Sequence, residues 1–400
     1  MENGCKKTTI IGLGRSGVKV IGKLHEAGLP GSINLLAFDT DEATLNASPL
    51  PDENKITADE KWRNGAGTGG DVVKGQRSMA RERGRIEELL KDSDLLILTG
   101  GLGGGTGTGG APAFAGVAKK LKINSIFVMT MPFSMEGHSK RRIAEDGIRE
   151  LLPLADVLLC LPNDLLFSCL PGDTHVEEAF VKADLEVART IRGIYEMMRQ
   201  GNLLPTDFAD LKDILSKKKS FCSIGVGTAS ASDGLNRCHL ALERMLDSPL
   251  LGGTTKINEA DAVIISLTGG SDLKIDETRK ALDAFQKFAP ENARTVIGAN
   301  TDPMYNEDVQ ITAIAVNFDK SKTSESLGAR NDSFGLEQST IIPQKRIQPE
   351  LDSGDLEQGE LPLQNLSRGI FLNSMPVNIN GEDLDIPTFQ RKMIIIDKGK

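Results

Sequence analysis

The stretch GGLGGGTGTGGAP, from Gly100 to Pro112, holds eight glycines and two threonines in thirteen residues. Glycine costs about 1 kcal/mol relative to alanine inside a regular element, so this composition indicates a loop that needs a bare backbone. The apolar run DLLILTG precedes it and APAFAGVAKKLK follows it, which predicts a strand, a glycine loop and a helix. In such a turn, backbone N–H groups converge on an anion and the helix dipole favours negative charge. Phosphate fits this chemistry best.

Two further glycine stretches complicate the choice of phosphate compound. GLGRSG, from Gly12 to Gly17, fits the pattern G-x-G-x-x-G, and Asp39 lies 22 residues beyond it. That spacing is typical of a dinucleotide-binding site, so an NAD-dependent oxidoreductase is one interpretation. GAGTGG at residues 65–70 is a third glycine loop. Three glycine loops at one edge of a sheet favour a single site that binds a triphosphate from several sides.

The elements around these loops predict an α/β fold. Short apolar runs alternate with helical patterns, which indicates a parallel sheet covered by helices on both faces. Ligands of such sheets bind at the carboxyl ends of the strands. The predicted strands are 8–14, 33–41, 94–100, 124–131 and 156–162, and the predicted helices are 16–28, 71–91, 111–122 and 140–152.

Composition excludes several classes of protein. The net charge of −9 over 400 residues argues against nucleic acid as the main partner. Five cysteines without a C-x-x-C pair, with only four histidines, argue against a zinc site or a disulfide framework and fit a reducing cytoplasm. The most apolar stretch, LLPLADVLLCLPNDLLF, is interrupted by Asp156, Asn163 and Asp164. We therefore expect no membrane span and no direct membrane insertion.

Taken together, the motifs resemble the FtsZ family of bacterial cell-division GTPases, in the tubulin superfamily. The resemblance covers roughly residues 8–319, through the loop at 100–110 and the motifs PFSMEG, LPNDLL, AFVKADLEVARTIRGI, TDFADLK, DSPLL and NARTVIGANTDP. It implies a tubulin/FtsZ-like α/β fold and binding of GTP and GDP with Mg²⁺. It also implies GTP hydrolysis, head-to-tail protofilaments, and a cytoplasmic division ring at mid-cell.

The resemblance also assigns residues that bind the nucleotide. Phe180 would lie against the guanine ring and Asp184 at its edge, where a carboxylate accepts hydrogen bonds from N1–H and the 2-amino group. These two residues are four apart on a predicted helix and share a face. Their spacing alone is more typical of a core phenylalanine with a solvated aspartate, and it is the resemblance that favours the binding role. The full set is Gly12, Gly14, Gly17, Lys19, Gly69, Gly70, Gly103, Gly104, Gly105, Thr106, Gly107, Thr108, Gly109, Glu136, Lys140, Phe180 and Asp184.

The resemblance implies that Glu136 lies at or near the ribose. Other assignments carry a physical argument of their own, and Lys140 can neutralise phosphate. Thr106 and Thr108 can donate hydroxyl groups to phosphate or help to order Mg²⁺, but no set of metal ligands follows from the sequence. Asp71 can cap the helix that follows it.

In the family, catalytic carboxylates reach the nucleotide of the next subunit, and here they match Asp207 and Asp210. The two are three residues apart at a predicted helix start, so they point roughly the same way. Orienting the attacking water is a sensible role for them, although Asp207 also fits an N-cap. Asp210 lies 26 residues beyond Asp184. At about 1.5 Å per helical residue, we expect an axial separation of roughly 35 Å.

Four positions depart from the family pattern. Arg15 and Ser16 stand where glycines are usual, Lys140 replaces an arginine, and Pro205 replaces the asparagine that accompanies the two aspartates. A lysine lacks the bidentate fork of arginine, and a proline donates no amide hydrogen bond. These departures motivate an alternative, a weakly hydrolysing structural or regulatory filament subunit.

We predict five regions along the chain. Residues 1–175 form the GTP-binding domain, 176–200 a central helix and 201–319 a smaller α/β domain at the filament contact. Residues 320–368 are polar, with few aromatic residues, and are predicted to be a disordered linker. Residues 369–400 form a partner-binding tail. Its segment LDIPTFQRK, residues 384–392, resembles the peptide by which the family binds a membrane-tethering division adaptor.

Overall fold

The computed structural model describes residues 7–29, 33–58, 67–168, 170–171, 173–198, 208–215, 220–234, 236–290, 292–318, 378–379 and 382–383. The first part of the chain forms a parallel sheet in the order β3-β2-β1-β4-β5-β6. Its strands are β1 (Thr8–Leu13), β2 (Ile33–Asp39), β3 (Lys55–Thr57), β4 (Leu95–Gly101), β5 (Asn124–Met131) and β6 (Val157–Pro162). The parallel sheet expected from the sequence is confirmed.

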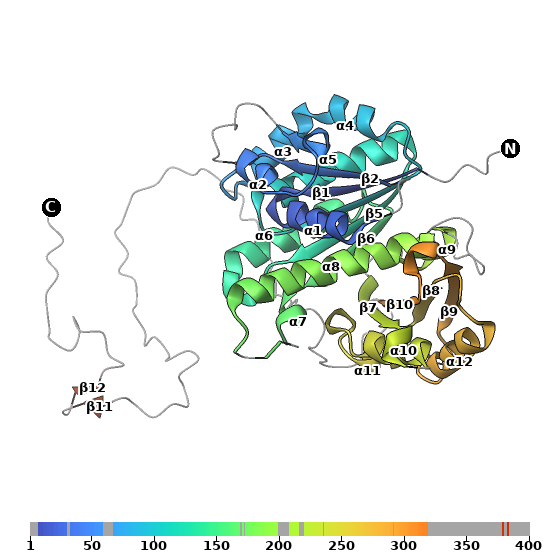
Figure 1. The fold of residues 1–400 in the computed structure, drawn as a ribbon. Coiled ribbons are helices and arrows are strands. Elements are labelled where there is room, and N and C mark those ends of the chain that lie inside the picture. The colour runs from blue at the N-terminus through green and yellow to red at the C-terminus, as the bar shows by residue number, and fades with distance from the viewer. Residues whose placement is uncertain are drawn as a thin grey trace, which may run out of the picture. The chain divides into compact units, whose positions relative to one another are not determined.

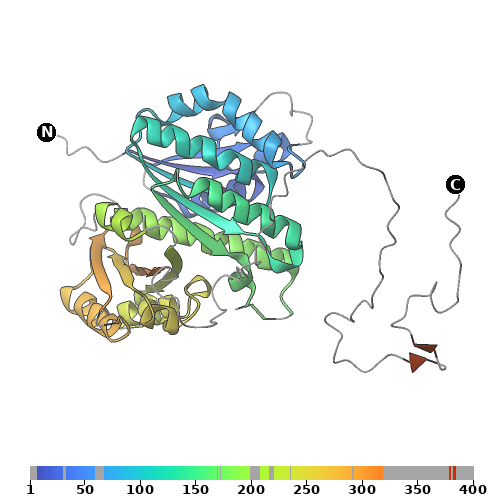
Figure 2. The same ribbon diagram turned by 180° about the vertical axis from the view of Figure 1, so that it is seen from behind.

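Helices cover both faces of this sheet, because successive strand residues point to opposite sides. Ile10 of β1 packs into a cluster with helices α1 (Gly14–Ala27) and α8 (Val176–Met198). Ile11 packs into a second cluster on the other face. The helices there are α3 (Val72–Arg81), α4 (Arg83–Leu90), α5 (Gly105–Leu121) and α6 (His138–Leu151). Helix α1 lies in front of the sheet in Figure 1, and α5 and α6 lie in front of it in Figure 2.

The prediction of a single long helix over residues 71–91 is wrong. The chain forms two helices, α3 and α4, separated at Glu82, whose φ of −80° and ψ of 0° break the helical path. Gly84, a poor helix former, lies in the first turn of α4. Met79 and Ile86, one on each side of this turn, pack into the same core cluster.

Helix α8 links the first sheet to a second one. Its 23 residues span about 35 Å. The second sheet has the order β7-β10-β8-β9, in which β10 is antiparallel to β7 and β8, and β8 is parallel to β9. Gly193 allows α8 to approach closely, since a Cβ there would lie 2.4 Å from Oγ1 of Thr312. The strands are β7 (Ser220–Ser230), β8 (Ala262–Gly269), β9 (Arg294–Thr301) and β10 (Asp308–Phe318).

Two helices, α10 (Arg237–Leu246) and α12 (Ile275–Gln286), cover the other face of the second sheet through their own apolar cluster. The smaller domain is therefore an α/β unit with α8 on one face and these helices on the other. The central helix expected from residue 176 and the smaller α/β unit expected after it are present, whereas the predicted domain boundaries stay predictions.

Chain contacts divide the protein into two units, residues 1–335 and 336–400. In the second unit, β11 (Asn378–Ile379) pairs antiparallel with β12 (Glu382–Asp383). The rest of the predicted linker and tail, including residues 384–392, lies outside the described residues, as do Asp207 and Pro205. Among the helices that the structure describes, none is both long and apolar enough to cross a membrane.

Candidate functional site

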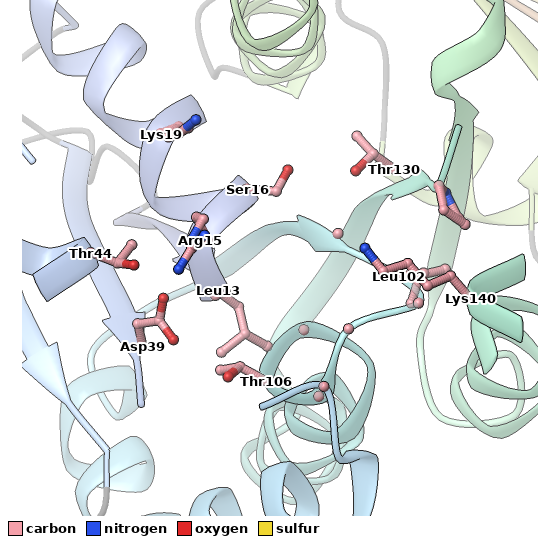
Figure 3. Close-up of a pocket in the computed structure, with 18 of the residues that line it drawn as sticks. Leu13, Arg15, Ser16, Lys19, Asp39, Thr44, Leu102, Thr106, Thr130 and Lys140 are labelled. Carbon is pink, nitrogen blue, oxygen red and sulfur yellow. The ribbon is translucent and has the colours of Figure 1, made fainter. Parts of the chain in front are cut away.

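A pocket of about 600 Å³ lies at the carboxyl ends of strands β1, β2, β4 and β5 (Figure 3). Its size is typical of a small-molecule site. The sequence-predicted residues that line it are Gly14, Lys19, Gly69, Gly70, Gly103, Gly104, Gly105, Thr106, Gly107, Glu136, Lys140, Phe180 and Asp184. The structure thus brings residues from three glycine loops and from α8 to one cavity.

Two helices begin at this pocket without a side-chain cap. Helix α1 starts after Leu13 and α5 after Gly104, and neither residue supplies a capping hydrogen bond from its side chain. The first N–H groups of a helix have no partner within the helix, and here they lie beside the cavity. Gly14 and Gly103 have φ of 71° and 91°, a region that favours glycine. The backbone therefore forms an anion site from two helix N-termini.

Four of the predicted residues are absent from the lining of the pocket. A Cβ at Gly12 would lie 2.3 Å from the carbonyl oxygen of Gly17, so both glycines permit close packing of β1 against α1. A Cβ at Gly109 would lie 2.3 Å from the carbonyl oxygen of Val72, at the contact of α3 with α5. The hydroxyl of Thr108 accepts a hydrogen bond of 2.9 Å from the N–H of Gly103. These residues support the loops from behind.

A network of threonines lies at the start of α5. The hydroxyl oxygens of Thr40 and Thr106 are 2.8 Å apart, and those of Thr68 and Thr106 are 3.4 Å apart. All three side chains are buried and line the pocket. Asp39 lies next to them, and burial raises the pKa of its carboxyl, opposed by hydrogen bonds from the N–H groups of Asp41 and Thr40. The network fixes the Thr106 hydroxyl at the edge of the cavity.

The opposite end of the pocket is aromatic. The ring of Phe180 meets Phe133 and Phe167 edge-on, with centroid distances of 5.2 and 5.6 Å. Phe133 and Phe180 both line the cavity. Burial raises the pKa of Asp184 to about 6, against the lowering effect of Lys19 and Lys23. This end offers an apolar surface beside a partly desolvated carboxylate, an arrangement that suits a flat, hydrogen-bonding ring.

Two ion pairs lie at the rim. Glu136 accepts hydrogen bonds from Lys140 Nζ at 2.8 Å and from the N–H of Phe133 at 2.9 Å. Arg15 Nη2 lies 3.4 Å from Asp41 Oδ2. Lys140 is therefore held by a neighbouring carboxylate four residues away.

Asp210 lies far from this pocket, in helix α9 (Phe208–Leu215). Arg294 donates a hydrogen bond of 2.9 Å to it and also pairs with Asp213. On the same helix, Lys212 Nζ lies 2.7 Å from Asp156 Oδ1. Asp156 comes directly before β6, so α9 lies at the amino edge of the first sheet, at the far end of α8 in Figure 1. The pocket and Asp210 are at opposite edges.

Two family models match the chain: the GTPase domain of the Tubulin/FtsZ family over residues 7–171, and the C-terminal domain of the FtsZ family over residues 221–319. A structure titled "FtsZ dimer, empty" from M. jannaschii is 28% identical, with a TM-score of 0.69, covering 82% of this chain and 96% of its own. A variant of FtsZ from M. jannaschii is 30% identical, with a TM-score of 0.67, covering 78% and 91%. The chain belongs to the tubulin/FtsZ family.

As a tubulin/FtsZ-family protein, the chain is a GTPase that binds guanine nucleotide. The resemblance seen in its motifs and the predicted tubulin/FtsZ-like fold are confirmed. CetZ2 from Haloferax volcanii, in a GTPgS-bound protofilament, shares the fold at 20% identity and a TM-score of 0.58, covering 77% of this chain and 92% of its own. The family match leaves the dinucleotide enzyme suggested by Gly12–Gly17 without support.

Sequence reasoning missed several residues of this GTPase pocket. Thr40 and Thr68 hold Thr106, and Phe133 with Phe167 supports Phe180. A weak signal existed for the threonines, since Thr40 lies at the carboxyl end of the predicted strand 33–41 and Thr68 lies within GAGTGG. Asn163 and Thr130 also line the cavity, each at the carboxyl end of a strand. Asp71 caps α3 through the N–H of Lys74, as expected.

Proposed function

We propose that this GTPase polymerises head to tail when it binds GTP, hydrolyses GTP at the contacts between subunits, and forms the division ring at mid-cell in the cytoplasm. The observation that carries the proposal is the separation of the pocket from Asp210. The match of residues 221–319 to the FtsZ C-terminal domain supports a division role.

The separation can be followed along two elements. Strand β6 spans six residues, or about 20 Å, between Asp156 at its start and Asn163 at the pocket. Along α8, the 14 residue steps from Asp184 to Met198 span about 21 Å. The expected figure of 35 Å was based on the 26 residues between Asp184 and Asp210, whereas the described helix α8 ends at Met198. Either distance is still too long for Asp210 to reach a γ-phosphate in its own pocket.

A subunit that binds GTP at one edge and carries Asp210 at the other has a heterologous contact, and such a contact builds a filament when it does not close. In that filament, Asp210, with Asp207, orients a water molecule toward the γ-phosphorus of the neighbour's GTP. The water forms a new P–O bond as the bond to the β–γ bridging oxygen breaks, and GDP and phosphate leave. Asp184 selects guanine by accepting hydrogen bonds from N1–H and the 2-amino group.

Mg²⁺ fits the phosphate end of this site. It prefers oxygen ligands, usually keeps several waters and is bound mainly through substrate phosphates. The hydroxyls of Thr40, Thr68 and Thr106 supply oxygen at that end. When bound, the ion neutralises charge on the phosphates.

Light scattering and phosphate release, measured together after addition of GTP and Mg²⁺, test the proposal. Scattering should rise on addition of GTP, and phosphate release should rise more than linearly with protein concentration, because each active site needs two subunits. Release that stays first order in protein at concentrations without filaments would contradict it.

A weakly hydrolysing filament subunit is the alternative, and the ion pairs at the rim favour it. Lys140 is held by Glu136, and Arg15 stands where a bare backbone is usual in the family. In that case scattering rises with GTP while phosphate release stays near background.

The predicted tail is tested separately. Deleting residues 384–400 should leave assembly in solution largely intact and abolish recruitment to a membrane-bound adaptor. Loss of all assembly would place the tail in the filament contact instead.

A further inference from the structure

Three positively charged side chains line the pocket among the residues that the structure describes: Arg15, Lys19 and Lys140. Lys140 is bound to Glu136 at 2.8 Å. At the aromatic end, the charge of Lys19 partly opposes the rise that burial causes in the pKa of Asp184. Arg15 is paired with Asp41 at a longer distance of 3.4 Å, and its side chain is 74% exposed. Arg15 is therefore paired more loosely than Lys140, and it does not lie beside Asp184 as Lys19 does.

Arg15 also lies at the end of the pocket where the last phosphate belongs. With the base against Phe180, the nucleotide extends from the end of β5 toward the end of β2, three strand spacings or about 14 Å away. Arg15 is in the first turn of α1, and Asp41 follows β2. In Figure 3, Arg15 lies beside Asp39 and Thr44, across the cavity from Lys140.

The charges at this end need a cation. Asp39 and Asp41 both line the cavity, and a triphosphate brings further negative charge to them. A guanidinium binds phosphate through two parallel N–H donors, whereas an exposed pair at 3.4 Å contributes little stability. Phosphate is thus the stronger partner for Arg15.

We propose that Arg15 exchanges Asp41 for the terminal phosphate when GTP binds, and that this exchange discriminates GTP from GDP. The inference rests on the proposed binding of guanine at Phe180 and Asp184. Asp41 then keeps its second role, since its carboxylate caps helix α2 (Glu42–Asn46) through the N–H of Ala43 at 3.1 Å.

Titration of fluorescent GTP, GDP and GMP, below the concentration at which filaments form, tests the exchange. Arg15→Gln keeps a long side chain but removes the charge, and should weaken GTP binding about tenfold or more. GDP should weaken far less and GMP not at all. Arg149→Gln is the matched control, because Arg149 is equally exposed at 71% and pairs with Asp146 on α6. It should change none of the three affinities.

Asp41→Asn sharpens the test, because asparagine still caps α2 but no longer attracts Arg15. It should tighten GTP binding in the wild-type background by more than it does in Arg15→Gln, where only the lost repulsion between Asp41 and the phosphates remains. Three results would overturn the proposal: unchanged GTP affinity in Arg15→Gln, equal weakening of GTP and GMP, or an effect of Asp41→Asn that is the same with and without Arg15. Equal binding of ATP and GTP by the wild type would instead overturn the proposed function.

Discussion

The two edges of the first sheet present different chemical groups. The pocket edge uses backbone N–H groups, glycines, buried threonines and the partly buried Asp184. The α9 edge uses half-exposed side chains, among which Asp210 is 38% exposed and Arg294 is 48% exposed. Binding therefore depends on a backbone shape that few substitutions preserve. The proposed chemistry depends on a carboxylate that becomes useful only against another subunit.

The largest effect should come from Asp210→Asn, which separates the two edges. GTP binding should be unchanged because Asp210 is outside the pocket, while phosphate release should fall about 100- to 10,000-fold. Asp213→Asn is the control, since Asp213 shares the partner Arg294 one turn further along α9. Binding and steady-state phosphate release would be measured on the same samples. Equal loss of activity in both variants would mean that the ion pairs with Arg294, not the carboxylate of Asp210, matter.

A second large effect should come from Gly104→Asp at the pocket edge. A Cβ at Gly104 meets nothing within 4 Å, and φ there is −103°, so aspartate fits without strain. Its carboxylate would cap α5 and occupy the phosphate position. We expect GTP binding to weaken about 100-fold or more while the melting temperature holds or rises. Gly104→Ala, which adds bulk without charge, should bind GTP nearly as well as the wild type.

These two variants together test whether the edges cooperate. Asp210→Asn supplies bound GTP, and Gly104→Asp supplies an intact Asp210. A mixture should release phosphate faster than the sum of its components, provided that the second variant still docks. A mixture no faster than that sum, with docking shown by co-sedimentation, would count against a shared site.

The smallest effect concerns Asp184, whose pKa burial raises to about 6. In the proposed site guanine binds the ionised carboxylate of Asp184, so GTP affinity should be constant above pH 7 and fall by up to about tenfold per pH unit below 6. GTP itself titrates in this range. Asp184→Asn is therefore the control, because its GTP affinity still reflects the titration of GTP but no longer that of Asp184. Identical pH profiles of affinity in the two proteins would contradict the assignment.

The same pKa shift predicts that the stability of the fold depends on pH in the opposite direction to GTP affinity. A carboxyl whose folded pKa lies above its unfolded value near 3.8 stabilises the fold at low pH, and this contribution is lost as pH rises through about 6. Asp184→Asn should therefore raise the melting temperature of the nucleotide-free protein at pH 7.5. The gain corresponds to at most about 3 kcal/mol, and it should vanish near pH 4.

Sequence reasoning reached the first sheet because its strands are short, buried apolar runs that alternate with helices. It failed at Glu82, since the helical pattern runs on through this residue and gives no signal for a one-residue turn. The sequence also predicted that Thr108 and Gly109 bind the nucleotide, whereas neither residue lines the pocket. In a glycine-rich loop, composition does not show which residues face the ligand and which support the loop.

The contacts between distant segments could not be predicted from the sequence for a related reason. The pairing of Arg294 with Asp210 joins residues 84 positions apart, and that of Thr40 with Thr106 joins residues 66 apart. Neither pair has a periodic signal, because such contacts follow from how two elements pack. The carboxylate of Asp184, in contrast, could be found because a motif fixed it relative to Phe180.

The location of α9 at the edge opposite the pocket determines how many complete active sites a filament contains. In any open filament with a shared site, one terminal subunit presents a pocket that no neighbour completes, and the other presents an Asp210 with nothing to act on. A filament then contains one fewer complete site than it has subunits. Turnover per subunit is lowest in the shortest filaments and approaches a plateau with length, so the GTP at one tip outlasts the GTP in the interior.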